Sequence, residues 1–201
     1  TTALFGDVNH PDRVFASGPA GLFVSLDSGD SWRSLRANMD NPNVSQVAVA
    51  ADGTLYAIAV PQPGAFVAKV DPDLSRLLFM TAYGDTAGIA PSSIAVDADG
   101  RVIIAGTTTS RNMPLSEGQA GPGGYQDGFV ARFDADGTQL EFARYLGGSD
   151  GDSVNSMTVS ANGDIYLAGG TSSVDFPVTE NALQPQNGAR VASGFISVFG
   201  F

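Results

Sequence analysis

The segment Gly147–Gly151, Gly-Gly-Ser-Asp-Gly, has the G-x-S-x-G spacing of a hydrolase nucleophile elbow. In such an elbow the serine stands on a sharp turn between a strand and a helix, and an acid and then a histidine follow it in the chain. Here strand-like sequence lies on both sides of the segment, and the only histidine, His10, precedes it. We therefore expect Ser149 to lie in a turn between two strands and not to act as a nucleophile.

Aspartates two residues apart suggest a second chemistry, because calcium loops begin with carboxylates at this spacing. Three pairs show it: Asp97 and Asp99, Asp134 and Asp136, and Asp150 and Asp152. The segment Asp7–Asp12 is a further acidic cluster. None of them continues into a complete set of calcium ligands, and Asp-Gly is also the chemistry of tight hairpin turns. Turn formation is the favoured interpretation, calcium is the alternative, and no other cofactor is expected.

The composition indicates an all-β protein. Of 201 residues, 43% are hydrophobic and 15% are charged, while 25 Gly and 11 Pro separate short runs rich in Val, Ile, Phe, Tyr and Thr. With 21 acidic and 10 basic residues the formal net charge is -11, which repels phosphate backbones and makes nucleic acid an unsuitable partner. No apolar run reaches the roughly 18 residues of a membrane span.

Two kinds of hairpin alternate along the chain. The first kind occupies 46–59, 93–106 and 156–169, each centred on Asp-Gly or Asn-Gly, which predicts type I′ turns. The second kind occupies 65–83 and 128–146, and it begins again at Gly194. Ile94 and Met157 are 63 residues apart, as are Phe66 and Phe129, so the unit repeats in register. Two hairpins make a four-stranded antiparallel sheet, and such a repeat predicts a β-propeller.

We expect one propeller domain or partial propeller over 1–201, with blades near 1–40, 44–85, 91–148 and 154–201. The last of these ends inside its third strand. An open set of blades would expose an apolar blade face and strand edges. The rest of a ring is therefore expected from a longer chain or from other subunits, or else the N-terminal segment completes the last blade.

One motif in the first unit resembles a known turn. Ser25, Asp27, Gly29, Ser31 and Trp32 fit S-x-D-x-G-x-[ST]-W, which resembles the Asp-box of sialidase-type and sortilin-type propellers. The resemblance implies a structural device on the blade edge, in which the Asp27 carboxylate accepts backbone hydrogen bonds and the Trp32 ring covers the turn.

The later units resemble a second family. The segment 145–179, "YLGGSDGDSVNSMTVSANGDIYLAGGTSSVDFPVT", is similar to the bacterial SBBP family of seven-bladed β-propeller repeats, and the likeness extends over about 44–201. It implies an extracellular or cell-surface bacterial protein. The long loops 107–126 and 170–192 are the expected binding segments for a protein or glycan ligand, because long loops on a rigid scaffold usually carry recognition.

The functional expectation is a non-catalytic module that acts as a structural scaffold or recognition platform, or as one unit of a larger extracellular assembly. No catalytic residues are assigned, and the chain is expected not to be an enzyme. The alternative is a carbohydrate-active enzyme of the sialidase or glycosidase type, or a glycan-binding propeller. That alternative requires an acid, a tyrosine and several arginines at one site, whereas the arginines are scattered along the sequence.

Overall fold

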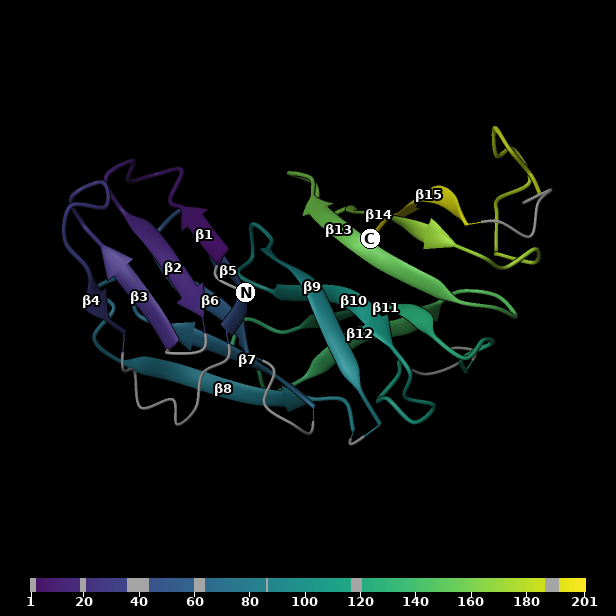
Figure 1. The fold of residues 1–201 in the computed structure, drawn as a ribbon, viewed down its shortest axis with the longest axis horizontal. Coiled ribbons are helices and arrows are strands. Elements are labelled where there is room, and N and C mark those ends of the chain that lie inside the picture. Colours follow the sequence, from purple (N-terminus) through teal and green to yellow (C-terminus); the bar gives the residue numbers. More distant parts are fainter. Residues whose placement is uncertain are drawn as a thin grey trace. The chain divides into compact units, whose positions relative to one another are not determined.

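The computed structural model describes residues 3–18, 21–35, 44–59, 64–85, 87–116, 121–186 and 192–201. Every regular element in these ranges is a β-strand, and the strands form four antiparallel sheets (Figure 1). The structure therefore confirms the predicted all-β class with propeller-type blades. Parts of the two predicted binding loops, 117–120 and 187–191, lie outside the described residues.

Each sheet is one blade, built from strands that follow one another in the chain. The first blade contains β1 (Ala3–Gly6), β2 (Val14–Gly18), β3 (Gly21–Ser25) and β4 (Arg33–Ser34), and the second contains β5 (Val44–Val49), β6 (Leu55–Ala59), β7 (Ala65–Val70) and β8 (Leu77–Tyr83). The third contains β9 (Ile89–Val96), β10 (Val102–Thr108), β11 (Asp127–Phe133) and β12 (Leu140–Leu146). The fourth has three strands, β13 (Asp152–Val159), β14 (Ile165–Thr171) and β15 (Ser193–Phe199).

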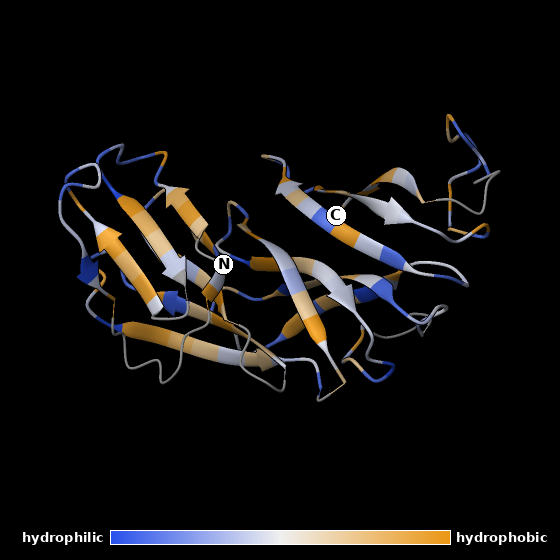
Figure 2. Cartoon of the chain, in the orientation of Figure 1, coloured by the Kyte–Doolittle hydropathy of each residue, from blue (hydrophilic) through white to orange (hydrophobic). Residues whose placement is uncertain are grey.

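The blades fall into two compact units, Thr1–Tyr83 and Gly84–Phe201. The single domain over 1–201 stays a prediction. In both units the hydrophobic residues follow the strands, and the turns are hydrophilic (Figure 2). The periodic pattern of the sequence therefore becomes a set of sheets with apolar faces.

In the first unit the two blades pack face against face. Their shared core contains Phe15, Leu22 and Val24 of the first blade and Leu55 and Val70 of the second, all of them buried. All five residues of β6 are buried, as the apolar run in this strand predicts for an inner position.

In the second unit the third and fourth blades share another core. It includes Ile103, Ala105 and Val130 of the third blade together with Ile165 and Leu167 of the fourth. The Ser92 hydroxyl on β9 also donates a 2.7 Å hydrogen bond to the Val154 carbonyl on β13. This interface fixes the relation of the two blades that carry the long loops.

The predicted turn type is wrong for the first set of hairpins. In the β5–β6 turn the amide of Gly53 bonds to the Ala50 carbonyl at 2.9 Å, and Gly53 has a φ of 87°. Gly100 and Gly163 have positive φ in the equivalent turns, whereas the Asp or Asn before each glycine does not. These connections are therefore four-residue turns that end in a left-handed glycine, because the Asp-Gly dipeptide sits one position later than a type I′ turn requires.

The N-terminal strand does not complete the last blade. β1 pairs with β2 and forms an outer position of the first blade. The fourth blade therefore has three strands in the described residues, as the sequence predicted from its end inside the third strand. Within the part of the chain that the structure describes, no helix has the length and apolarity needed to cross a membrane.

Candidate functional site: the loop rim and groove of the second unit

Ser149 lies where the sequence predicted, between β12 and β13. Its amide and its hydroxyl both donate to Asp175 Oδ1 at 2.8 Å. These bonds lower the pKa of the Asp175 carboxyl below its ordinary value. The serine thus joins two loops, and the G-x-S-x-G segment lies in a turn between two strands, as the sequence predicts.

The pair Asp97 and Asp99 serves a hairpin turn and an arginine. Asp97 Oδ1 accepts the amides of Asp99 and Arg101 at 3.0 and 2.9 Å. The Arg101 guanidinium binds both carboxylates, at 2.7 Å from Asp97 and 2.5 Å from Asp99. Because a guanidinium already neutralises these oxygens, they are poor candidates for a metal.

Asp134 also belongs to a turn, and the same device recurs in three blades. Asp134 Oδ1 accepts the amide of Thr138 at 2.7 Å, and Oδ2 accepts the Thr138 hydroxyl at 2.9 Å. Asp71 binds Ser75 in the same way, with 2.7 and 2.9 Å. Asp136, the second member of the predicted pair, is exposed.

The Asp-box-like segment is the third example of this turn. Asp27 accepts the Ser31 amide at 2.8 Å and the Ser31 hydroxyl at 2.5 Å, as well as the Ser25 hydroxyl at 2.7 Å. Hydrogen bonds from Ser25 and then from Ser31 lower the pKa of Asp27 to about 2. Trp32 donates to the Gly29 carbonyl at 3.0 Å and its side chain is 42% exposed. The spacing Asp-x-x-x-Ser/Thr between the third and fourth strands is therefore the signal shared by all three turns.

The acidic cluster near the N-terminus is an ion pair. The Asp7 carboxylate is buried and accepts the Asn9 amide at 2.9 Å and Arg13 Nε at 2.5 Å. Burial raises the pKa of Asp7, but these hydrogen bonds and the Arg13 charge outweigh it, so the pKa lies below its ordinary value. In the described residues, no three His, Asp or Glu side chains gather as a metal-binding group.

Hydrogen bonds join the two predicted binding loops to β12 and to the loop that carries Ser149. Tyr145 on β12 donates to the Ser110 carbonyl at 3.0 Å and accepts the Met113 amide at 3.1 Å. The Asp150 amide donates to Ser173 Oγ at 2.9 Å, and the Asp152 amide donates to the Gln126 carbonyl, also at 2.9 Å. We call the described parts of these three loops the rim: 109–116, 121–126, 147–151 and 172–186.

Glycines allow the rim loops to pass very close to one another. A side chain at Gly124 would overlap the Asp150 carbonyl, and one at Gly151 would overlap the ring of Tyr125. Tyr125 is 70% exposed although its ring lies against the Gly151 backbone. The glycine-rich composition of 121–124 and 147–151 is therefore a requirement for packing as well as for turning.

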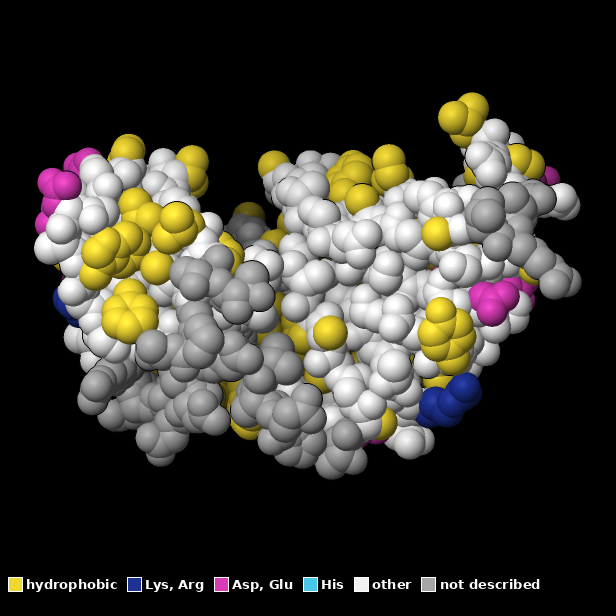
Figure 3. Space-filling view, viewed as in Figure 1, with side chains coloured by type: hydrophobic (Ala, Val, Ile, Leu, Met, Phe, Trp, Pro, Cys, Tyr) yellow, Lys and Arg dark blue, Asp and Glu magenta, His cyan; other side chains and the backbone are white. Residues whose placement is uncertain are grey.

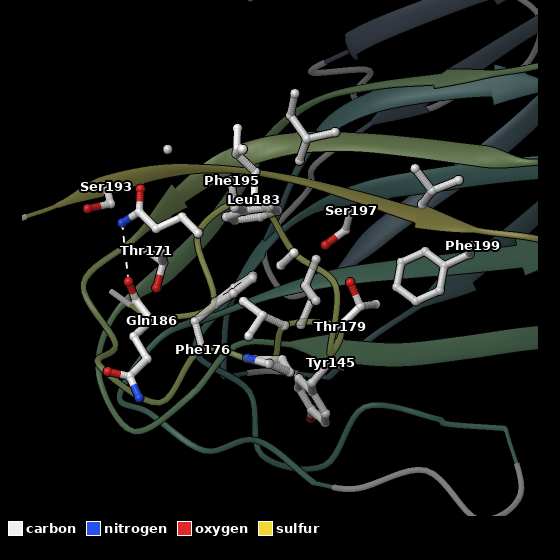
Figure 4. A pocket seen from close by; sticks show the side chains of 18 of the residues that line it. Tyr145, Thr171, Phe176, Thr179, Leu183, Gln186, Ser193, Phe195, Ser197 and Phe199 are labelled. Carbon is white, nitrogen blue, oxygen red and sulfur yellow. Dashed lines mark hydrogen bonds between the residues drawn. The ribbon is translucent and has the colours of Figure 1, made fainter. Parts of the chain in front are cut away.

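Beside the rim lies a groove with a volume of about 1040 Å³. Its lining comes from the end of β12, from the loop 176–186 and from β15 (Figure 4). Phe176 stacks on Phe195 with 4.5 Å between ring centroids. The polar lining residues are hydroxyl and amide side chains and one guanidinium, and they comprise Thr171, Thr179, Gln184, Gln186, Ser193, Ser197, Tyr145 and Arg144.

Two buried carboxylates lie beneath the rim, and only one of them, Asp152, was among the predicted site residues. Asp127 begins β11, Asp152 begins β13, and each is 1% exposed. Sequence analysis missed Asp127 because it stands alone in a glycine-rich loop, with no partner at a recognisable spacing. Asp150 is exposed, so the third predicted pair is divided between the surface and the interior.

The comparisons with known proteins agree with this fold. Residues 141–177 match the SBBP family model, which is described as a beta-propeller repeat. No curated protein matches the sequence. Among solved structures, an ancestral GH74 enzyme matches with a TM-score of 0.54 and 12% identity, over 84% of this chain and 22% of that one.

Two further solved structures are similar at lower scores. A luciferin-regenerating enzyme has a TM-score of 0.49 and 11% identity, over 83% of this chain and 54% of that one. A protein named as a gluconolactonase has a TM-score of 0.46 and 17% identity, over 78% and 53%. The present chain therefore spans about a fifth to a half of these proteins.

The prediction that the chain is not an enzyme is wrong, because a solved structure that it matches with a TM-score of 0.54 is that of an enzyme. The repeat architecture, with no catalytic set visible in the sequence, predicts a non-catalytic scaffold or recognition platform, but an enzyme has the same architecture. At 12% identity the likeness shows the fold alone, so no activity or catalytic residue is transferred to this chain.

Proposed function

We propose that this chain is a section of a larger β-propeller in a secreted or cell-surface bacterial protein, and that its rim groove recognises a neutral oligosaccharide. The repeat match and the propeller fold support the first part. The chemistry of the groove supports the second part. The observation that carries the larger propeller is an uncovered face on the fourth blade.

Equivalent positions of the third and fourth blades differ sharply in exposure. In the third blade the cross-strand row is Ser93, Ala105 and Val130. Ala105 and Val130 belong to the core shared with the fourth blade, and Val130 is 0% exposed. The same row of the fourth blade ends at Ile196, which is 80% exposed.

A neighbouring row repeats this contrast. Ile103 of the third blade is 1% exposed, whereas Tyr166, 63 residues later in the fourth, is 41% exposed. Val198 beside Tyr166 is 52% exposed. Figure 3 shows hydrophobic side chains at the surface over the sheet β13–β14–β15. The occupant that fits this face is another blade of the same type, because the equivalent rows of the third blade are covered by the fourth blade.

The groove offers the two kinds of contact that sugar rings need. Exposed side chains of Val178 and Leu183 and the half-buried ring of Phe195 can pack against the apolar faces of a sugar, and the hydroxyl and amide side chains can bond to its hydroxyl groups. Among the residues that the structure describes, the lining contains one charged side chain, Arg144, and no carboxylate. The guanidinium of Arg144 lies over the rings of Phe142 and Phe199, so the main polar contacts that the groove offers are uncharged hydroxyl and amide groups. These favour a neutral oligosaccharide, and the absence of a carboxylate disfavours a strongly basic ligand.

The mass of the 201-residue chain in solution tests the uncovered face. We expect light scattering to give a mass that rises above 20.6 kDa with concentration, because apolar faces of two copies cover each other. Ile196→Asp should abolish this association. Val8→Asp is the matched control, since Val8 is 89% exposed in a turn of the first blade. A chain that stays monomeric at every concentration contradicts the larger propeller.

Binding to an array of neutral oligosaccharides tests the groove. Leu183→Ala and Gln186→Ala alter exposed lining residues and should weaken binding at least several-fold, whereas Leu78→Ala on β8 should not. Chromatography of the incubated sugars tests the carbohydrate-active enzyme alternative, because hydrolysis leaves shorter products. Unchanged binding in both groove variants would contradict recognition at this site.

A further inference from the structure

The buried carboxylates of Asp127 and Asp152 flank the backbone of Gly147. A side chain at Gly147 would overlap an oxygen atom of each of them. The two strands that begin at these residues belong to different blades, and the rim loops 121–126 and 147–151 lead into them. Two negative charges of the third and fourth blades are thus held close together in the interior.

The hydrogen bonds of the pair leave one oxygen of each carboxylate without a donor. Asp152 Oδ2 accepts the Gly148 amide and the Ser173 hydroxyl, both at 2.8 Å. Asp127 Oδ2 accepts the Gly124 amide at 3.3 Å. The Oδ1 atoms of both residues are buried and have no hydrogen-bond partner. A buried carboxylate oxygen without a partner is costly, so this place calls for positive charge.

The described part of the chain supplies little of that charge. Burial raises the pKa of Asp127, the neighbouring Asp152 raises it further, and the Gly123 and Gly124 amides and the Arg111 charge lower it by less. The Arg111 guanidinium donates to the Gly124 carbonyl at 3.0 Å. Among the described residues, neither carboxylate takes part in a salt bridge.

The repeat shows that the first position of this strand can hold an apolar side chain. Ile89 precedes Asp152 by 63 residues and begins β9 as Asp152 begins β13. Ile89 is buried and packs against Gly84, which is the equivalent of Gly147. In the third blade the equivalent serine bond is accepted by Asp85 instead, so that bond does not require a carboxylate at this position. What distinguishes Asp152 is its second oxygen, which is buried and has no hydrogen-bond partner.

We propose that Asp127 and Asp152 bind a calcium ion that ties the rim loops to the third and fourth blades. Calcium takes six to eight oxygen ligands, which include carboxylates, backbone carbonyls and water. The two carboxylates would provide the charge, and the neutral ligands would be water and backbone carbonyls of the loops 121–126 and 147–151, which lead into the two strands and contact each other. The site is independent of a ligand in the groove.

Calcium chloride and terbium chloride are the probes, used with the full 201-residue chain. With calcium at about 100 times its dissociation constant, the melting temperature should rise by roughly 5 °C or more above its value in EGTA. Excitation of tyrosine should sensitise terbium emission, because Tyr125 lies against Gly151. Excess calcium should remove that emission.

Three variants decide the assignment. Asp127→Asn and Asp152→Asn should each abolish the calcium shift and reduce terbium emission at least tenfold. Asp85→Asn is the control, since Asp85 accepts a 2.7 Å bond from Ser110 as Asp152 does from Ser173, one repeat later. Its calcium response should equal that of the natural chain. Because Asp127→Asn relieves repulsion, it should fold in EGTA, and calorimetric titration of this variant gives a second measurement.

Two results would overturn the proposal. If the natural chain shows neither a calcium shift nor terbium emission, the carboxylates share a proton and hold no metal ion. If the Asp127→Asn and Asp152→Asn variants still bind calcium with unchanged affinity, the ion lies elsewhere. Both results leave the test of groove recognition unaffected, because the array measures sugar binding in the natural chain.

Discussion

Two isoleucines provide a quantitative test of the uncovered blade face. Ile103 in the third blade is 1% exposed, and Ile196 in the fourth is 80% exposed. Replacement by alanine removes the same atoms at both positions. At Ile103 it leaves a cavity in the core that contains Val130 and Leu167, which should lower the free energy of unfolding by roughly 2–5 kcal/mol. At Ile196 the change should stay within about 0.5 kcal/mol, because the side chain is already in water.

Urea denaturation followed by far-ultraviolet circular dichroism measures both values. The protein concentration must be low enough that light scattering gives the monomer mass, since association would cover Ile196. Linear extrapolation then gives the free energy of unfolding of each variant. If Ile196→Ala costs as much as Ile103→Ala in the monomer, the face is covered within the chain itself and the reasoning is refuted. In a longer chain with a further blade, the cost at Ile196 should approach that at Ile103.

Three other predictions concern charges and close contacts. Arg13→Met should destabilise the first unit by roughly 3 kcal/mol, because it leaves the buried Asp7 carboxylate unpaired. Since the folded-state pKa of Asp7 is lowered, the ion pair stabilises the folded state above the unfolded pKa of about 4. This stabilisation is lost as the pH falls from there through the folded-state pKa. Urea denaturation of the natural chain and of Arg13→Met at several pH values checks this. A difference in the free energy of unfolding that stays constant between pH 2 and 7 would speak against it. Asp127→Asn in EGTA should raise the melting temperature at neutral pH. Burial and the neighbouring Asp152 raise the folded-state pKa of Asp127, and the Arg111 charge opposes this. The protonated Asp127 carboxyl therefore favours the folded state, fully so below its unfolded pKa, and this stabilisation is lost as the pH rises through the folded-state pKa. The gain in melting temperature should therefore be small near pH 4 and larger near pH 8. A gain that does not depend on pH would contradict the repulsion between the buried Asp127 and Asp152 carboxylates. Gly124→Ala should lower the melting temperature and speed amide exchange in 147–151, because the new methyl group meets the Asp150 carbonyl. Gly121→Ala is the control, because its new methyl group would meet no atom of the described residues within 4 Å apart from the adjoining backbone, and equal effects would refute the close crossing.

The blade architecture could be predicted from the sequence because its causes are local. Strand alternation, turn residues and the 63-residue register define hairpins, and two hairpins define a blade. The turn type was wrong because the dipeptide Asp52-Gly53 does not show which residue begins the turn. The Ala50 carbonyl decides that, through its bond to Gly53.

The candidate site followed from the sequence in part. The loops 107–126 and 170–192 were identified from their length, and the second of them does line the groove. The acidic pairs were misleading, because carboxylate spacing looks the same in a turn and in a metal loop. Asp97 and Asp134 are satisfied by groups in their own turns.

The sequence by itself determined which segments become strands and that they recur as blades, since these properties depend on neighbours a few residues away. Only the tertiary structure decided which side chains meet across blades. Asp127 and Asp152 are 25 residues apart and belong to different sheets, and they approach one another because Gly147 leaves room between them. The exposure of Ile196 likewise depends on whether another blade packs against it, which no local pattern encodes.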